Sequence, residues 1–343
     1  MRPRSSHGPG GAVPATHREI RLVSRPEGAP GAGHLAAEEV PVPEPGPGRL
    51  LVRNRIMSVT AAMRTMMTES DLPMPAFVPG RALWGPAVGE VVRASGGGFA
   101  PGDLVVHPYG WREYAVVEEE RAHHADPAVL PDPAAYLSQG ATAWGALTRT
   151  APVRPGDTVF VTGAAGGVGA MAGQIARRLG ARRVIGSTGS PHKAERLRTE
   201  LGYDDIVVRG AGPALEQLRR AAPEGVDVLL DTVGGEQLAA ALAVAATGAR
   251  CALVGALTAQ LGGAPAAVRV DPALMVARRI TLAGFSRQDH PDLPGEWAAE
   301  FGRGLRDGSL VFPHVRLRGI AQAPRALFEL TEGRHIGSVL VEV

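Results

Sequence analysis

The spacing of hydrophobic residues divides the chain into two parts with different patterns. In the first part, short hydrophobic stretches between Gly, Pro and polar residues lie at 18–23, 50–59, 88–94, 103–107 and 114–117. Stretches of this length that are bounded by turn residues are typical of β-strands. Their close, repeated spacing predicts a compact β-rich domain early in the chain.

Beyond about Pro131, helical and strand-like stretches alternate. The predicted helices lie at 136–147, 168–179, 193–201 and 236–246, and the predicted strands lie at 158–162, 184–187, 226–231, 249–254 and 280–285. Alternation of this kind predicts a parallel sheet with helices on both faces. The last stretch, 312–343, has a strand–helix–strand pattern, and its final strand at 338–343 could rejoin the first domain.

Length and charge narrow the class of protein. A chain of 343 residues is too long for one ordinary hydrophobic core and predicts two domains. The net charge is only +2 and the charged residues are interspersed, so no nucleic-acid partner is expected. No bilayer-spanning run or secretory pattern is present, which predicts a cytoplasmic protein without a membrane partner. Residues 1–17, rich in Gly, Pro and Ser, are predicted to form a disordered tail.

The candidate metal ligands are few. Cys251 is the only cysteine, which excludes an intrachain disulfide and a multi-cysteine zinc site. Because it lies in a hydrophobic run, we interpret it as a small buried side chain rather than a reactive thiol. His107, His123 and His124 lack cysteine partners and helical His-x-x-x-His spacing. We therefore expect solvated loop histidines and no metal site.

The most specific motif is a glycine turn at 163–169. A hydrophobic strand enters the turn, which contains Gly163, Gly166, Gly167 and Gly169, and a predicted helix follows. Glycines there permit a tight turn and close approach of backbone N–H groups to a pyrophosphate, which the N-terminus of the helix also attracts. The alternative is an ordinary strand-to-helix turn. The context favours dinucleotide binding, with the contacts formed by Ala165, Gly166, Gly167 and Val168.

The end of the second strand of this unit indicates which dinucleotide is bound. Sites for NAD usually place Asp or Glu there, on the ribose 2′-hydroxyl. The segment 184–190 contains no acid, and it is followed by Lys193. Hydroxyl and cationic groups suit a 2′-phosphate, so Ser190, Lys193 and Arg209 predict NADPH. The alternative for Lys193 is a solvated surface lysine.

Taken with other segments, these motifs resemble the zinc-independent medium-chain reductases, in the branch of the prostaglandin and curcumin reductases. The resemblance runs from about Arg18 to the C-terminus and is carried by the segments 21–28, 40–48, 88–92, 99–105, 110–116, 163–176, 189–193, 231–235 and 332–337. It implies a GroES-like β-rich catalytic domain (18–133 and 313–343) with a doubly wound Rossmann domain (134–312) inserted. It also implies a homodimer, and a cleft between the domains for nicotinamide and substrate.

The resemblance extends to the reaction and to further contacts. It implies that NADPH reduces the carbon–carbon double bond of a small hydrophobic enone or enal. The cofactor contacts that it adds are Thr232, Gly255, Ala256, Leu257, Phe285 and His335. Residues expected at the substrate are Met63, Trp144 and Arg287.

Several residues depart from the pattern of this branch. Ala62 and Gln260 stand where the branch has tyrosines, Trp144 replaces another tyrosine, and His335 replaces an asparagine. The developing enolate oxygen therefore needs another donor, for which the candidates are Tyr109, Thr258, Gln260, His335 and a ribose hydroxyl. Tyr109 and Trp144 are equally compatible with plain packing in the cleft.

Two other classes of function stay open at this point. One is an enzyme of the same fold with altered chemistry, such as quinone or ketone reduction or a tailoring step in natural-product synthesis, which the lost tyrosines favour. The other is a non-enzymatic NADPH-binding protein.

Overall fold

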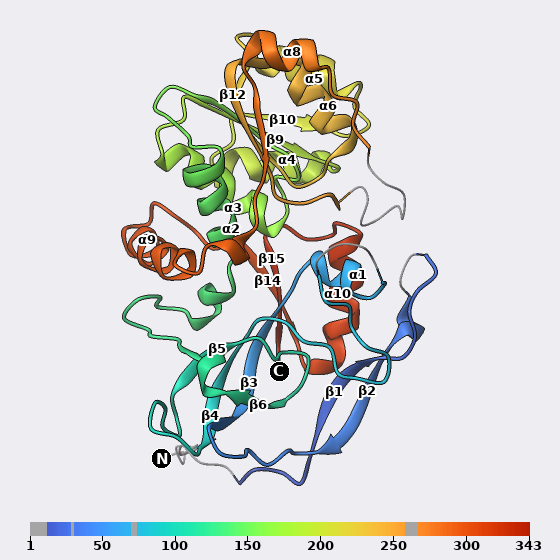
Figure 1. Ribbon diagram of the computed structural model, residues 1–343, viewed down its shortest axis with the longest axis vertical. Helices are drawn as coiled ribbons and strands as arrows, with labels where there is room; N and C mark the ends of the chain where they lie inside the picture. The colour runs from blue at the N-terminus through green and yellow to red at the C-terminus, as the bar shows by residue number, and fades with distance from the viewer. Residues whose placement is uncertain (1–11, 29–30, 70–73, 258–266) are drawn as a thin grey trace, which may run out of the picture.

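The computed structural model describes residues 12–28, 31–69, 74–257 and 267–343. Two sheets organise two halves of the molecule (Figure 1). One is a six-stranded parallel sheet with the order β10-β9-β8-β11-β12-β13. Its strands are β8 (Thr158–Val161), β9 (Arg183–Thr188), β10 (Asp205–Val208), β11 (Val226–Asp231), β12 (Ala245–Leu253) and β13 (Thr281–Gly284).

Hydrophobic side chains on both faces of this sheet are buried, as the alternation of strands and helices predicted. In β8, Val159 and Val161 face one core while Phe160 faces the other, because successive side chains of a strand point to opposite faces. The covering helices are α3 (Gly167–Arg178), α4 (Pro191–Glu200), α5 (Ala214–Ala221), α6 (Gly235–Ala243) and α8 (Pro272–Arg278).

The direction of the strand order reverses between β8 and β11. The chain moves outward from β8 to β9 and β10, then returns to the other side of β8 with β11. Ligands of doubly wound sheets bind beyond the carboxyl ends of the strands at such a reversal. The glycine turn lies at this point, since it directly follows β8.

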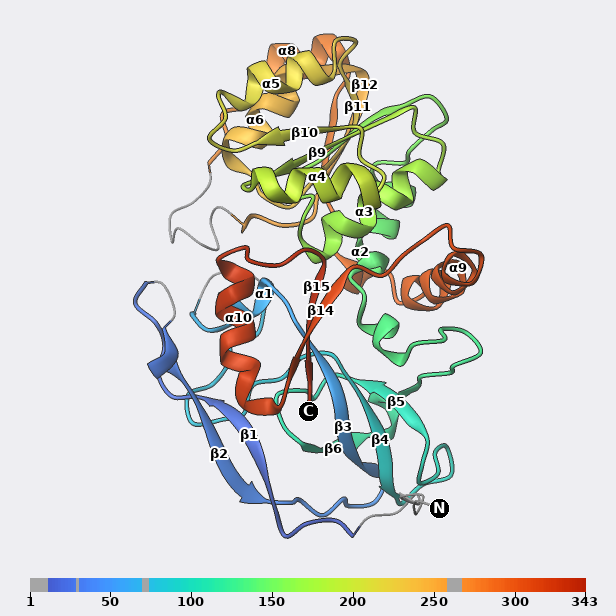
Figure 2. The same ribbon diagram turned by 180° about the vertical axis from the view of Figure 1, so that it is seen from behind.

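The second sheet has the order β14-β15-β3-β4-β5-β7, and β6 pairs with β3. Its strands are β3 (Arg49–Val59), β4 (Ala87–Ala94), β5 (Leu104–His107), β6 (Tyr114–Glu118), β7 (His123–His124), β14 (His314–Arg318) and β15 (Ser338–Glu342). A separate pair is formed by β1 (Thr16–Leu22) and β2 (Leu35–Pro41). Because β15 runs antiparallel to β3, the last strand does rejoin the first part of the chain, as the sequence indicated (Figure 2).

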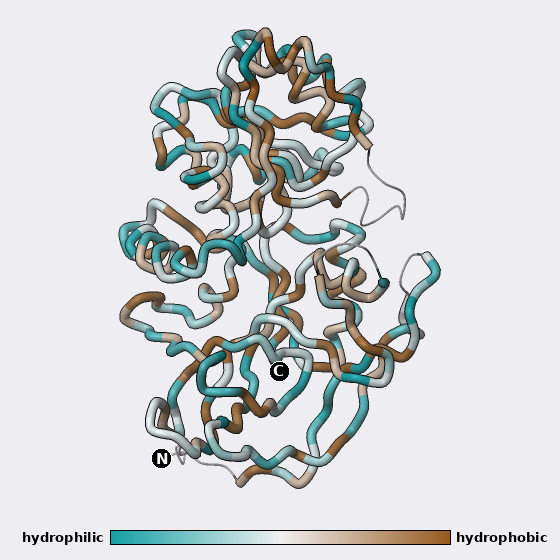
Figure 3. The backbone as a smooth tube through the Cα atoms, viewed as in Figure 1, coloured by the Kyte–Doolittle hydropathy of each residue, from teal (hydrophilic) through white to brown (hydrophobic). Residues whose placement is uncertain are grey.

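The remaining helices are α1 (Ala62–Met66), α2 (Gly140–Gly145), α9 (Leu293–Asp307) and α10 (Ala323–Thr331). Helix α9 buries Leu293, Trp297 and Phe301 in the larger core. It packs closely on α2, since a Cβ on Gly140 would lie 2.3 Å from the ring of Trp297. In Figure 3, hydrophobic stretches run through the interior of both halves. No helix within the described ranges is long and apolar enough to cross a membrane.

Three expectations about local structure need correction. The first strand begins at Thr16, two residues earlier than expected, and the side chain of His17 is buried, so the predicted tail extends too far. Residues 1–11 lie outside the described residues. The strand β2 was not expected, because its alanines and glutamates do not favour a strand.

The single helix expected at 136–147 is divided into three short segments. A 3-10 helix spans Pro133–Leu137, α2 follows, and a π-helical segment spans Ala146–Thr150. The break is at Ser138, which has an extended backbone and whose hydroxyl accepts a hydrogen bond from the N–H of Gly140 at 3.1 Å. A side chain that bonds to the local backbone competes with a continuous helix in this way.

Candidate cofactor site at the glycine turn

The glycine turn joins β8 to α3 by a tight backbone that favours glycine. Gly163 has φ +62°, in the left-handed region, and a Cβ on Gly169 would lie 2.4 Å from the carbonyl oxygen of Gly163. Gly166 forms the exposed N-cap of α3, which no side chain of the described residues caps. The twelve-residue helix therefore presents free backbone N–H groups at its positive end, which suits an anion such as a pyrophosphate.

A buried hydrogen-bond network holds the ends of β8 and β11 together. The hydroxyl of Thr162 donates to Asp231 Oδ1 at 2.5 Å, and the N–H of Thr232 donates to the same hydroxyl at 2.8 Å. Burial raises the pKa of Asp231, although hydrogen bonds from Thr162 and the backbone N–H groups of Gly234 and Val233 oppose this rise. This network holds the ends of β8 and β11 in place beside the glycine turn.

The segment after β12 folds over the same edge of the sheet. The N–H groups of Val254 and Gly255 donate to the carbonyl of Asp231, and that of Leu257 donates to the carbonyl of Thr232 at 3.0 Å. The expected cofactor residues Thr232, Gly255, Ala256 and Leu257 thus follow β11 and β12 on the edge that carries the glycine turn. Thr258 and Gln260 lie outside the described residues.

The acid-free end of β9 is bordered by an arginine. The N–H of Arg209 donates to the carbonyl of Thr188 at 2.9 Å, and its guanidinium lies over Gly189, where a Cβ would come within 2.6 Å of Nη2. Arg209 is exposed, and no hydrogen bond or ion pair joins its guanidinium to another described residue. Ser190 is the N-cap residue of α4 beside it. A 2′-phosphate would meet a hydroxyl and a free cation here.

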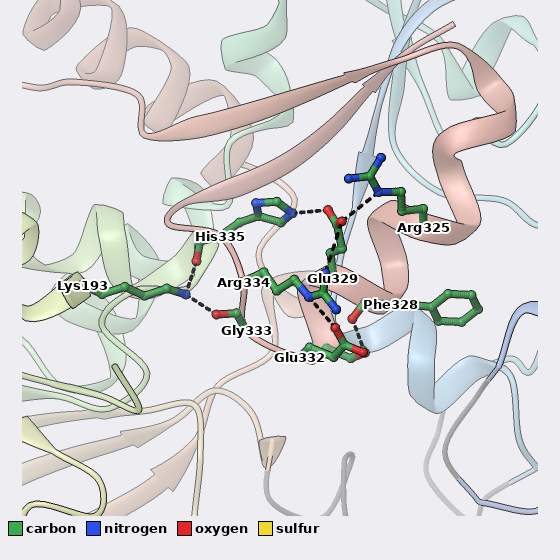
Figure 4. Close-up of polar contacts among 9 residues, drawn as sticks. Lys193, Arg325, Phe328, Glu329, Glu332, Gly333, Arg334 and His335 are labelled. Atoms are coloured by element: carbon green, nitrogen blue, oxygen red, sulfur yellow. Dashed lines mark hydrogen bonds and ion pairs between the residues drawn. The ribbon is translucent and has the colours of Figure 1, made fainter. Parts of the chain in front are cut away.

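Lys193 has a different environment from the one expected (Figure 4). Its ammonium donates hydrogen bonds to the backbone carbonyls of Gly333 and His335, the latter at 2.7 Å. The residue is 9% exposed, so the alternative of a solvated surface lysine is wrong. Burial also lowers the pKa of Lys193.

The residues Glu332–Gly337, named here the C-terminal loop, lie directly on the glycine turn. The N–H of Gly337 donates to the carbonyl of Ala165 at 2.9 Å, and Gly166 and Gly337 form an isolated bridge. His335 directs its ring to α10, where Nε2 lies 2.8 Å from Glu329 Oε2. The C-terminal loop therefore connects the cofactor edge of the parallel sheet to the second sheet through β15.

Comparisons with known proteins agree with this geometry. Residues 18–125 match the model of the N-terminal domain of oxidoreductases, and 167–301 match that of zinc-binding dehydrogenases. The chain is 30% identical to the NADPH-dependent curcumin reductase of Escherichia coli over 95% of this chain and 97% of that protein. It is 28% identical to prostaglandin reductase 1 of Bos taurus, over 92% and 95%. The structure of CurA from Vibrio vulnificus in complex with NADPH matches with a TM-score of 0.88 at 29% identity, covering 95% of this chain and 99% of that one.

The chain belongs to the zinc-independent medium-chain dehydrogenase/reductase family, in the branch of the curcumin and prostaglandin reductases. It is an NADPH-dependent oxidoreductase. The GroES-like and Rossmann-like architecture expected from the resemblance is confirmed. The domain boundaries at 133 and 313 stay a prediction.

Tyr109, a candidate donor to the enolate oxygen, is hydrogen-bonded within its own half of the molecule. Its hydroxyl donates to Glu118 Oε2 at 2.8 Å and accepts from Arg121 Nη1 at 3.2 Å, and its ring packs on the core under β3 and β6. Burial and the Glu118 carboxylate raise the pKa of Tyr109. Because its only proton is donated to Glu118, Tyr109 would have to give up this hydrogen bond to reach an enolate oxygen, and its catalytic role stays a prediction.

Three expected side chains of the cleft belong to packed interfaces. Met63 is 2% exposed and packs against Gly85 and Trp111, and its contact with substrate stays a prediction. Trp144 donates its indole N–H to Glu296 of α9 at 2.6 Å. The side chain of Phe285 is buried against Gly145 of α2, and a contact of this residue with the cofactor stays a prediction.

Other candidate residues have mixed outcomes. Arg287 lies exposed in a short 3-10 helix, and its contact with substrate stays a prediction. Cys251 is buried, as expected, and burial raises its pKa to about 12. His123 and His124 are exposed in β7, but His107 is 3% exposed, so the expectation of a solvated loop histidine is wrong for it. Within the described ranges, no three His, Cys, Asp or Glu side chains gather as a metal site requires.

Sequence reasoning missed two residues at the cofactor edge. The carboxamide of Gln139 lies over Gly167, where a Cβ would be 2.5 Å from Nε2. Glu329 holds the ring of His335 from α10. No local motif marks either residue, because each meets its partner only through the tertiary fold.

Proposed function

We propose that this enzyme uses NADPH to reduce the carbon–carbon double bond of an α,β-unsaturated carbonyl compound. The observation that carries the proposal is the site itself: an uncapped helix N-terminus behind a glycine turn, next to the acid-free strand end that Arg209 borders. The relatives favour this reaction, since they include proteins named as curcumin reductase, 2-alkenal reductase and (+)-pulegone reductase.

The residues present fit the cofactor. Gly167 and Val168 would hold the pyrophosphate with backbone N–H groups, whereas the N–H of Gly166 donates to the carbonyl of Gly163 within the turn. Ser190 and Arg209 would hold the 2′-phosphate. When bound, NADPH supplies the hydride for the β-carbon of the substrate. The protein has to orient the two reactants and stabilise the negative charge that develops on the carbonyl oxygen.

The hydrogen bonds of two candidate donors to that oxygen reduce the number of candidates. Tyr109 is engaged by Glu118 and the ring of His335 by Glu329, so neither is proposed for this role. Of the residues predicted from the sequence, Thr258 and Gln260 stay candidates, together with a hydroxyl of the nicotinamide ribose. The proton for the α-carbon comes from solvent or from that hydroxyl in this proposal.

A second candidate is reduction of a quinone or a ketone, including a tailoring step in natural-product synthesis. It is favoured by Ala62, at the start of α1, which has no hydroxyl at the position where the resemblance implies a tyrosine. The two reactions are distinguished by the position at which hydride is added.

The deciding experiment follows NADPH consumption with enones, enals and quinones and identifies the products. With NADPH that carries deuterium at C4 of the nicotinamide, double-bond reduction places deuterium on the β-carbon. Deuterium on the carbonyl carbon would support ketone reduction instead. Absence of turnover with every acceptor would favour a binding protein.

We also propose that the enzyme is a homodimer, as the resemblance implies. The strand β13 lies at the edge of the six-stranded sheet, where a second copy can add its own edge strand. Light scattering should then give a mass of twice 35.6 kDa, whereas a mass of one chain would contradict the proposal.

A further inference from the structure

Helix α1 belongs to the second half of the molecule but begins beside the cofactor edge of the parallel sheet (Figures 1 and 2). The strand β3 ends at Val59, which pairs with Val339 of β15. Just before Val339, Gly337 forms the isolated bridge with Gly166 of the glycine turn. Because α1 starts at Ala62, shortly after β3, an acceptor that approaches a nucleotide at this edge from the second half of the molecule would meet this helix.

The backbone of α1 does little to hold this helix in place. It has only five residues, and isolated helices shorter than about 12 residues have little stability of their own. Ala61, the residue before it, has no side-chain group that caps the N-terminus. The guanidinium of Arg64 donates to the carbonyl of Gly28, whereas the hydroxyl of Thr65 is buried without a hydrogen-bond partner among the described residues. The position of α1 therefore depends mainly on how its hydrophobic side chains pack.

The hydrophobic face of α1 consists of methionines. Five of the eight methionines of the chain pack in one core and are named here the methionine cluster: Met57, Met63, Met66, Met67 and Met74. Met63, Met66 and Met67 are spaced three and four residues apart, which places them on one face of α1. All three are buried, at 2%, 7% and 0% exposure. Helix α1 thus contacts this core through thioether side chains rather than through branched or aromatic ones.

Methionine packs differently from the other hydrophobic residues. Its side chain is unbranched, rotates about three bonds and carries a polarisable sulfur, so it can fill a space of changing shape. The terminal methyl of Met63 lies against Gly85, where a Cβ would come within 2.3 Å of it. Met57 is fixed by contrast, because its sulfur accepts the N–H of Trp111 at 2.9 Å. The cluster thus combines one anchored methionine on β3 with a layer of adaptable side chains under α1.

We propose that α1 is the adaptable wall of the substrate site and that the methionine cluster determines the range of acceptors. A cyclic enone would displace α1 toward its core, and the side chains of Met63, Met66 and Met67 would repack behind it. A small linear enal would leave the helix where it lies. The small side chain of Ala62 at the start of α1 leaves room for the larger compounds. The proposal rests on the proposed function, since it names linear and cyclic α,β-unsaturated carbonyl compounds as substrates of the same site.

The experiment compares a bulky cyclic enone with a small linear enal in a variant whose α1 carries branched side chains. Leucine has nearly the volume of methionine, so Met63→Leu, Met66→Leu and Met67→Leu together keep the core filled but make it stiffer. We expect kcat/KM for the cyclic enone to fall at least about 10-fold, and kcat/KM for the enal and the Kd for NADPH to change less than about twofold. Met171→Leu, which changes a buried methionine of the other core, is the matched control and should leave all three values unchanged. Equal losses for the two acceptors, or no loss for either, would overturn the proposal.

A second measurement needs neither acceptor nor nucleotide. In protein labelled with carbon-13 at the methionine methyl groups, NMR relaxation dispersion reports exchange between conformations on the microsecond to millisecond timescale. We expect such exchange for Met63, Met66 and Met67 and none for Met171, with each signal assigned through the corresponding change to leucine. Methyl groups of α1 that are as rigid as that of Met171 would overturn the proposal.

A single change replaces the triple variant if that variant does not fold. Met66→Leu alone should lower the ratio of kcat/KM for the cyclic enone to kcat/KM for the linear enal by at least about threefold, and an unchanged ratio would contradict the proposal. The NMR measurement is made without turnover. Absence of turnover with every acceptor would therefore contradict the proposed double-bond reduction, while the exchange of the methyl groups would still decide whether α1 is adaptable.

Discussion

The hydroxyl of Tyr109 and the carboxylate of Glu118 are hydrogen-bonded at 2.8 Å, on neighbouring segments of the seven-stranded sheet. Arg121 donates to the same hydroxyl at 3.2 Å. The tyrosine thus links β6 to the loop that precedes it, and its proton is already donated. A tyrosine whose proton is used in this way supports the structure, whereas a tyrosine that stabilises an enolate needs its proton free for the substrate.

Tyr109→Phe should therefore leave catalysis almost unchanged. Loss of a partly exposed hydrogen bond should lower the free energy of unfolding by about 0.5–1.5 kcal/mol, with kcat changed less than about twofold. Steady-state kinetics and urea unfolding measure the two effects. A main oxyanion donor would instead cost ~2.7–4 kcal/mol, or about 100- to 1000-fold in kcat, and such a loss would restore the role predicted from the sequence.

Trp144, an expected substrate contact, provides a second test. Its indole N–H donates to Glu296 at 2.6 Å, and its ring lies 6.0 Å from that of Trp297 on α9. We expect Trp144→Phe to lower the free energy of unfolding by about 1 kcal/mol through loss of this hydrogen bond. The ratio of kcat/KM for small enals to kcat/KM for cyclic enones should differ less than about twofold between Trp144→Phe and the unaltered protein. A larger change in that ratio would place Trp144 in the substrate pocket after all.

Much of the fold was predictable because hydrophobic periodicity reports burial. The strand β11 was predicted at 226–231 and spans Val226–Asp231, since hydrophobic residues on both of its faces are buried. The helix α9 was not predicted. Its buried Leu293, Trp297 and Phe301 are spaced four residues apart, but Pro294 and Gly295, which disfavour a helix, lie in its first turn.

The cofactor site was predictable in part for a related reason. The glycine turn is local, and its strand–turn–helix context is visible in the sequence. The partners of the side chains around it come from distant segments, since Lys193 bonds to a loop 140 residues later. The residue types show which hydrogen-bond partners these polar side chains can accept. Which partner each side chain contacts depends on the tertiary fold, and the sequence does not show it.

The close approach of α3 to the glycine turn makes a sharp prediction for Gly169. A Cβ at this position would lie 2.4 Å from the carbonyl oxygen of Gly163 and 2.6 Å from Cα of Ala164, both backbone atoms. Gly169→Ala should therefore displace the turn, lower the free energy of unfolding by about 1–3 kcal/mol and weaken NADPH binding. Gly97→Ala, where a Cβ meets nothing within 4 Å, is the matched control. Equal behaviour of the two variants in thermal unfolding and NADPH titration would contradict the packing argument.

His107 should make the stability of the protein depend on pH. Its ring is buried, Nδ1 accepts the N–H of Tyr109 at 3.1 Å, and Nε2 has no partner among the described residues. Burial, with a smaller contribution from the charge of Arg112, lowers the pKa of His107 from its ordinary value of 6.5 to about 3. Well above pH 6.5 the ring is neutral in both the folded and the unfolded chain, so it contributes no pH dependence there.

Below pH 6.5 the unfolded chain binds a proton at His107 that the folded chain does not, so stability falls as the pH is lowered toward 3. This histidine should cost about 2 kcal/mol of unfolding free energy at pH 5 relative to pH 7.5. In His107→Gln that part of the decrease should vanish, whereas His123→Gln, which changes an exposed ring, should keep it. His17, whose pKa burial also lowers, contributes equally to all three proteins. Urea unfolding at pH 7.5, 6 and 5 measures the three slopes, and parallel slopes for His107→Gln and the unaltered protein would show that His107 takes up its proton while buried.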